Sequence, residues 1–262
     1  MHFRIETAIN EIQKKFLESE KPDAIRAASE HSAFSSHLEE LGVKVVRIPP
    51  AKAHPYQVNT RDIGVSGPDG VVLGKFRFDI RRGEIDISER ALSQANVRIV
   101  GRTTRCFEGG DFVYIGPGKA ALGVGVRTDP DVVEELTRLL QVDIVTVSFA
   151  EEFLHLDMVF NCVAPGICVR CPDALPGDFL SYIDSLGFDS IEVTKEDVFN
   201  HACNLLALAP FHVVAPREHP YVTKALRARG VRVDVIDLTE ITKSGGGPRC
   251  ISFPIAREPC ST

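Results

Sequence analysis

The sequence has no excess of basic residues and no long apolar segment. Its 262 residues include 30 Lys and Arg against 36 Asp and Glu, which gives a formal net charge of −6. A general nucleic-acid-binding protein normally carries a basic stripe, so this balance argues against that class. No segment reaches the roughly 20 uninterrupted apolar residues that span a bilayer. The composition therefore predicts a globular protein that binds neither nucleic acid nor a membrane.

Targeting signals and metal-binding patterns are also scarce. Residues 1–6 lack a basic region followed by an apolar one, so we expect no signal peptide. The 7 cysteines are odd in number and scattered, which indicates a reducing, cytoplasmic setting. Cys168 and Cys171 form a single Cys-x-x-Cys pair near Cys162, without the second pair of a structural zinc site, so we expect no metal. No Gly-x-x-x-x-Gly-Lys-Ser/Thr loop indicates nucleotide chemistry.

What the sequence does contain is an internal repeat. Each repeat begins at one anchor residue that opens a short, mostly apolar run, and successive anchors are 49, 46, 47 and 46 residues apart. The first four runs are followed by a second apolar run, with Gly or Pro beside each pair, as hairpins require. The five anchors are Asp62, Asp111, Asp157, Asn204 and Cys250.

Each hairpin is followed by an expected helix and a third strand. Apolar residues recur at steps of three to four within 130–140, which predicts one buried helix face. Gly187 and Gly230 are placed to end two of the helices. The expected helices are 24–41, 86–94, 130–140, 176–186 and 220–229, and the expected closing strands are 43–48, 97–100, 142–147, 191–193 and 231–236.

The unit is therefore strand–strand–helix–strand, about 47 residues long, and it occurs five times. One unit alone has too little core to be stable, so we expect the five to pack around a common axis as one α/β domain over residues 1–262. The anchors would then line one central cavity. Buried carboxylates are costly unless they meet cations or hydrogen-bond donors, so this cavity should accept a cationic, donor-rich ligand.

Several short segments resemble the guanidino-group-modifying enzymes, which share the fivefold α/β-propeller (pentein) fold. The resemblance extends from about residue 54 to 258, in the family's order and at similar spacing. Its members include arginine deiminase, dimethylarginine dimethylaminohydrolase and the amidinotransferases. The segments are Thr60-Arg61-Asp62, Arg81-Arg82-Gly83-Glu84, Glu108-Gly109-Gly110-Asp111, His155-Leu156-Asp157 and Gly245-Gly246-Gly247-Pro248-Arg249-Cys250.

The resemblance implies a role for each site residue. Cys250 occupies the position of the nucleophile, and His155, with Glu108 beside it, that of the general acid and base. Asp62 and Asp157 would clamp the guanidinium, whose N–H donors carboxylates accept in pairs. Arg81 and Arg127 match two arginines that hold the substrate's carboxylate. Asn59 and Asp111 complete the expected substrate-binding set.

The implied activity is hydrolysis of the guanidino group of arginine or an N-methylated arginine, without a cofactor. A delocalised guanidinium carbon is a poor electrophile, so a thiolate attacks it and forms a covalent thiouronium intermediate. His155 protonates the leaving nitrogen and then activates water, which yields citrulline and ammonia or methylamine. The expected partner is a small guanidino substrate, and a homodimer remains open.

Two alternatives stay open at this stage. An amidinotransferase would use an amine in place of water, and a non-catalytic pentein would bind a partner, as the ribosome anti-association factor does.

Some residues depart from the family pattern: Gly245 stands where deiminases usually have arginine, and Arg61 where dimethylarginine hydrolases usually have an acid. Arg82 is expected outside the site, and Arg249 is either a surface charge or a group that lowers the pKa of the thiol.

Overall fold

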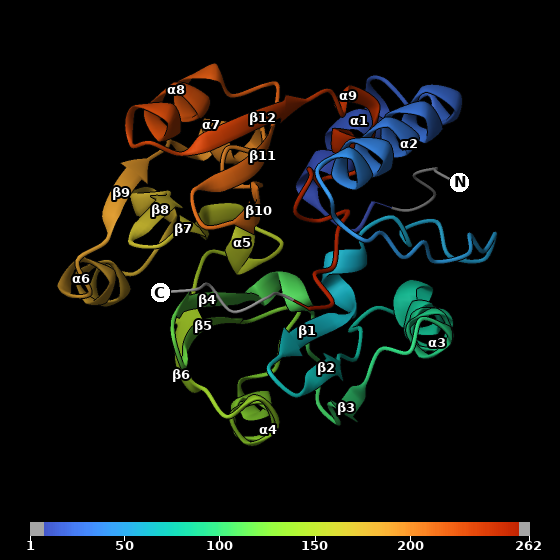
Figure 1. Ribbon diagram of the computed structural model, residues 1–262, viewed down its shortest axis with the longest axis horizontal. Helices are drawn as coiled ribbons and strands as arrows, with labels where there is room; N and C mark the ends of the chain where they lie inside the picture. The colour runs from blue at the N-terminus through green and yellow to red at the C-terminus, as the bar shows by residue number, and fades with distance from the viewer. Residues whose placement is uncertain (1–7, 257–262) are drawn as a thin grey trace.

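The computed structural model describes residues 8–256, and within them four three-stranded sheets surround a common centre (Figure 1). In each sheet the first strand pairs antiparallel with the second, and the second pairs parallel with the third. The sheets are β1 (Gly64–Gly67), β2 (Gly70–Leu73) and β3 (Ile99–Arg102); β4 (Phe112–Gly116), β5 (Lys119–Val124) and β6 (Asp143–Ser148); β7 (Phe160–Ala164), β8 (Ile167–Arg170) and β9 (Asp189–Glu192); and β10 (Leu206–Ala209), β11 (His212–Pro216) and β12 (Arg232–Ile236).

The long helices lie on the outside of this ring, as the apolar faces predict (Figure 1). Gly187 and Gly230 directly follow the last turns of two of them, each with φ of +77°, which a glycine adopts without strain. The helices are α1 (Glu11–Glu18), α2 (Ala24–Glu40), α3 (Asp79–Gln94), α4 (Val133–Leu140), α6 (Gly177–Ser185) and α8 (Pro220–Ala228), with shorter α5 (Leu156–Val159), α7 (Lys195–Phe199) and α9 (Thr239–Thr242) and the 3-10 turns η1 (Thr60–Ile63), η2 (Gly109–Asp111), η3 (Pro130–Val132) and η4 (Pro172–Ala174).

The middle strand is the most buried strand of every sheet. All four residues of β8 and four of the five in β11 are buried, whereas β9 and β12 are largely half-buried or exposed. Consecutive residues of a strand point to opposite faces, so unbroken burial means that both faces of these middle strands are covered, which favours apolar residues along most of their length. The strand–strand–helix–strand prediction is therefore correct for the first four units.

The fifth unit differs from the expectation. Residues 43–48 and the run from Cys250 to Phe253 were expected as strands, and neither forms one. Residues 44–48 make no backbone–backbone hydrogen bond to the described part of the chain, because no strand lies between them and residues 251–256 to supply the partners. A cavity of about 1830 Å³ opens there, lined by both segments; Cys250 and His155 do not line it.

Helix boundaries also shift by a few residues. The largest shift is at α3, which begins at Asp79 rather than at residue 86. Gly83 concealed this start in the sequence, because glycine inside a helix lowers its propensity. The structure needs glycine there, since a Cβ would collide with the His54 ring. The earlier start brings Arg81 into a helix turn that faces the centre, where it is 1% exposed.

No helix among residues 8–256 is long and apolar enough to cross a membrane.

Candidate active site

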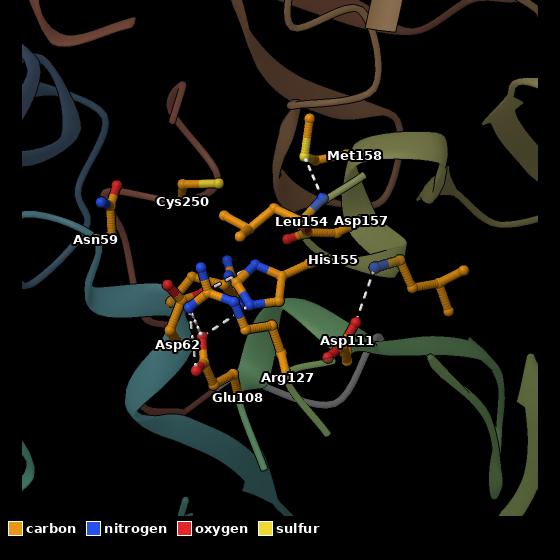
Figure 2. A network of polar contacts seen from close by, with 12 residues as sticks. Asn59, Asp62, Glu108, Asp111, Arg127, Leu154, His155, Asp157, Met158 and Cys250 are labelled. Carbon is orange, nitrogen blue, oxygen red and sulfur yellow. Dashed lines mark hydrogen bonds and ion pairs between the residues drawn. The ribbon is translucent and has the colours of Figure 1, made fainter. Parts of the chain in front are cut away.

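The polar residues of the site lie just ahead of the first strand of each unit. Short helical turns, η1, η2 and α5, directly precede β1, β4 and β7. Asp62 lies in η1, Glu108 precedes η2, and His155 and Asp157 lie at and inside the start of α5. Since the first strands face the common centre, their leading residues meet there, and Figure 2 shows them around one point together with Cys250.

Three buried oxygens at this point have no hydrogen-bond partner among the described residues. They are Oδ1 of Asn59, of Asp62 and of Asp157. A buried acceptor without a partner costs about 1–3 kcal/mol, so three in one place indicate an absent donor. A planar cation with several N–H groups supplies such donors, which agrees with the ligand predicted from the anchors.

Cys250 is held beside these oxygens by the loop that follows α9. Its carbonyl accepts a hydrogen bond from the Arg61 backbone N–H at 2.9 Å, which fixes the loop next to Asp62. A Cβ on Gly246 would lie 2.8 Å from the Cys250 Cβ and 2.6 Å from Asn59 Oδ1, so only glycine allows this approach. Burial raises the pKa of the Cys250 thiol, and the negative charges of Asp157 and Asp62 raise it further.

His155 and Glu108 form a buried hydrogen-bonded pair. His155 Nε2 lies 2.9 Å from Glu108 Oε2, and its Nδ1 lies 3.6 Å from Asp62 Oδ1. Burial opposes the charge on His155, but Asp62 and the Glu108 hydrogen bond outweigh it and raise its pKa to about 9. Burial likewise opposes ionisation of Glu108, yet the His155 bond and Arg127 lower its pKa to about 2. At neutral pH the pair is therefore an imidazolium and a carboxylate, and the imidazolium can donate a proton.

Arg81 and Arg127, expected to hold a substrate carboxylate, are both buried against acids of this chain. Arg81 bonds Asp62 Oδ2 at 2.6 Å and Glu84 at 2.9 Å, and its guanidinium stacks on the Phe76 ring. Burial opposes the charge on Arg81, but the surrounding carboxylates outweigh it and raise its pKa. Arg127 contacts Glu108 at 3.2 Å and donates to the Ile9 carbonyl at 2.7 Å. The carboxylate-binding role of both arginines stays a prediction.

Asp111 is occupied by structural hydrogen bonds. Its Oδ1 accepts from the Leu156 backbone N–H at 2.9 Å and its Oδ2 from the Thr128 hydroxyl at 2.7 Å. Burial raises the pKa of Asp111 to about 7. Because Leu156 opens α5, Asp111 fixes the helix turn that carries His155 and Asp157. Its predicted contact with substrate remains untested.

Two residues contact the site residues although the predicted set of catalytic and substrate-binding residues did not include them. Arg249 is buried and donates to Asp157 Oδ2 at 2.8 Å, so it is not a surface charge. Asn204 donates to Cys250 Sγ. The repeat spacing offered a signal for Asn204, because anchors of adjacent units are neighbours, whereas nothing in the sequence distinguished Arg249 from an exposed arginine.

Asp62, Glu108 and His155 are the one group of potential metal ligands found in the described part of the chain, with ligand atoms within 4.8 Å of one another. Arg81 lies 2.6 Å from Asp62 and 3.7 Å from Glu108, and Arg127 also pairs with Glu108. A divalent cation would face two guanidinium groups there. The charges therefore fit an ionised acid–histidine pair better than a metal site.

Comparisons with known proteins show the family to which the chain is similar. The family described as N,N dimethylarginine dimethylhydrolase, eukaryotic, matches residues 1–257. Uncharacterised protein YkgA of Bacillus subtilis (strain 168) is 31% identical over 257 residues, which cover 98% of this chain and 89% of the relative. An arginine deiminase of Rhodococcus jostii (strain RHA1) is 31% identical over 190 residues, which cover 58% of this chain and 46% of that enzyme.

Solved structures show the same fold. The N-terminal domain of ArgZ, in a variant covalently bound to a reaction intermediate, superposes with a TM-score of 0.84 at 22% identity and covers 96% of this chain and 93% of its own. A dimethylarginine dimethylaminohydrolase adduct with 4-chloro-2-hydroxymethylpyridine gives 0.77 at 22% identity, over 93% and 95%. The expected pentein fold and the resemblance to guanidino-modifying enzymes are both confirmed. The chain thus belongs to the N,N-dimethylarginine dimethylhydrolase family, within the pentein superfamily.

Proposed function

We propose that the chain is a cysteine-dependent hydrolase that converts arginine or an N-methylated arginine to citrulline and releases ammonia or methylamine. The observation that carries the proposal is the set of three unpartnered buried oxygens, on Asn59, Asp62 and Asp157, beside a free thiol and an imidazolium. A guanidinium would satisfy those acceptors and place its central carbon within reach of a nucleophile.

Substrate binding follows from the charges. The guanidinium donates to Asp62 Oδ1 and Asp157 Oδ1, while Arg81 and Arg249 keep the second oxygen of each carboxylate. Of the two arginines assigned to the substrate carboxylate, Arg127 is the better placed, since its Nη2 donates to a neutral acceptor, the Ile9 carbonyl. An anion could replace that neutral acceptor without leaving a buried acid unpaired.

The chemistry uses Cys250 and His155. The Cys250 thiol loses its proton to water, and the resulting thiolate adds to the guanidinium carbon. The C–N bond to the leaving nitrogen then breaks, and His155 protonates that nitrogen as ammonia or amine departs. Water, deprotonated by the now neutral His155, then adds to the thiouronium carbon. The C–S bond breaks, and citrulline and the thiol are released. Glu108 stabilises the charged form of His155 throughout.

A panel of guanidino compounds tests this proposal. Purified protein is incubated with arginine, N-monomethylarginine, N,N-dimethylarginine and agmatine, and the ureido product and the released amine are quantified. Citrulline from one of the first three supports hydrolysis. Ornithine without citrulline in the presence of glycine shows amidino transfer instead, and no turnover of any compound contradicts the proposal. The proposed function also includes a reducing, cytoplasmic location, because the nucleophile must stay a free thiol.

A further inference from the structure

Asn204 lies against the proposed nucleophile. It precedes β10 at the anchor position of the fourth unit, 46 residues before Cys250, the anchor of the fifth. The side chain is 2% exposed, and its Nδ2 lies 2.8 Å from Cys250 Sγ. Adjacent anchors thus contact each other at the centre of the ring, and in this pair the side-chain amide of Asn204 contacts the sulfur of Cys250.

The orientation of the amide is fixed by its other contacts. Asn204 Oδ1 accepts from the backbone N–H groups of Arg249 at 2.9 Å and of Cys250 at 3.3 Å. Backbone N–H groups only donate, so the oxygen must face them and the NH₂ group must face the sulfur. An amide NH₂ group has no acceptor capacity, so its contact with Sγ is a donated hydrogen bond, which is stronger to a thiolate than to a thiol.

We propose that Asn204 is a further catalytic residue, whose side-chain amide stabilises the thiolate of Cys250 and aims it at the guanidinium carbon. The inference rests on the proposed function, in which that thiolate is the nucleophile. The other surroundings of the sulfur oppose its ionisation, since it is buried and two carboxylates, of Asp62 and Asp157, lie near it. Asn204 is the one side chain in the described residues that donates a hydrogen bond to Sγ.

The glycine loop keeps this pair together. A Cβ on Gly247 would lie 3.0 Å from Asn204 Oδ1, and one on Gly246 would lie 2.8 Å from the Cys250 Cβ. The loop backbone therefore packs directly on both side chains, and neither can move away without displacing it. A single asparagine sets the position of the loop through its oxygen and the charge state of the sulfur through its nitrogen.

The test is the pH dependence of Cys250 alkylation by iodoacetamide, a neutral reagent, followed by mass spectrometry of the modified peptide. Asn204→Ala removes the donor, and we expect the apparent thiol pKa to rise by about one unit and alkylation at pH 8 to slow about tenfold. Asn204→Asp keeps an oxygen for the two N–H groups and is the variant of choice if the alanine form does not fold. Asn204→Asp should raise the apparent thiol pKa further than Asn204→Ala, because it replaces a hydrogen-bond donor by a negative charge. Asn200→Ala, at an exposed asparagine four residues earlier, is the control and should leave the profile unchanged.

An unshifted profile in the folded Asn204 variants overturns this inference, whatever the protein's turnover. The proposed function fails separately, when the unmodified protein turns over no guanidino compound even though the Asn204 variants shift the profile. The same profile distinguishes a purely structural role. If the variants are alkylated as fast as the unmodified protein at high pH but with a displaced midpoint, Asn204 stabilises the thiolate. If alkylation is slower at every pH with an unchanged midpoint, only positioning is lost, and the assignment is overturned.

Discussion

Arg81 binds one of the two carboxylate oxygens of Asp62. Arg81 Nη1 lies 2.6 Å from Asp62 Oδ2, while Asp62 Oδ1 has no hydrogen-bond partner among residues 8–256. Asp157 repeats this arrangement with Arg249, which takes Oδ2 and leaves Oδ1. Each acid is therefore charge-compensated before a ligand arrives and still offers one acceptor. We therefore expect a cationic ligand to bind between these two carboxylates, each of which already pairs with an arginine of this chain.

Replacing Arg81 should mainly affect stability. Arg81→Met leaves Asp62 and Glu84 buried without their cation, which costs about 3–5 kcal/mol of unfolding free energy. Denaturant-induced unfolding measures the loss. Arg82→Met is the matched control, because the Arg82 side chain is 58% exposed and pairs with the exposed Asp79 on the surface. Equal unfolding free energies for the two variants would refute the buried ion-pair assignment.

Replacing Arg127 should raise the KM of substrates that carry a carboxylate more than that of substrates that lack one. Arg127→Met is expected to raise the KM for arginine by about 10- to 100-fold and to change that for agmatine, which lacks the carboxylate, much less. Steady-state kinetics on both substrates provide the comparison. Equal losses on arginine and agmatine would instead assign Arg127 to its Glu108 contact alone.

The space around His155 admits no side chain at residue 110. A Cβ on Gly110 would lie 2.6 Å from His155 Nδ1 and 3.0 Å from Asp62 Oδ1. Gly110→Ala should therefore displace the imidazole and lower turnover about 100-fold or more. Gly125→Ala serves as the control, because nothing lies within 4 Å of a Cβ there. The geometry of the site is wrong if both variants retain full activity.

Removing the thiol should abolish turnover without unfolding the protein. Cys250→Ser is expected to reduce turnover at least about 10³-fold, since a serine hydroxyl in this environment is not ionised. Cys162→Ala, at a half-buried cysteine in β7, is the control and should retain activity. Thermal unfolding of both variants and a citrulline assay give the two readouts. A fully active Cys250→Ser variant would exclude covalent catalysis at this residue.

The pH dependence follows from the His155–Glu108 pair. The pKa of His155 is raised to about 9, so its contribution to stability is complete below about 6.5 and is lost as the pH rises through 9. The pKa of Glu108 is lowered to about 2, so its contribution is present above about 4.5 and is lost as the pH falls through 2. Turnover should fall above pH 9, when the proton donor is lost. NMR titration of the His155 ring checks this, and Glu108→Gln should bring its pKa down.

The repeat spacing was enough to predict most of the fold, because each unit builds its own hairpin, helix and closing strand from local patterns. Asp62, Asp157 and Cys250 could be predicted to converge for the same reason: residues at equal positions in units around one axis must approach it. The α3 start at Asp79 could not be predicted, since the fit of Gly83 against His54 depends on a residue far away in the sequence. The single-domain organisation, the homodimer and the cytoplasmic location stay predictions.

The period of the repeats and the residue types at their anchors were sufficient to predict that the anchors reach the centre of the ring. The tertiary packing of the units sets the contacts that these and the other site residues make with one another. In the folded chain Arg81 pairs with Asp62 and Glu84, and Arg249 is buried against Asp157. Asp111 accepts a hydrogen bond from the first residue of α5, and Asn204 donates one to the sulfur of Cys250. The physical reason is that burial makes every charge and donor depend on its nearest partner, and partners from different units are set by packing rather than by sequence distance.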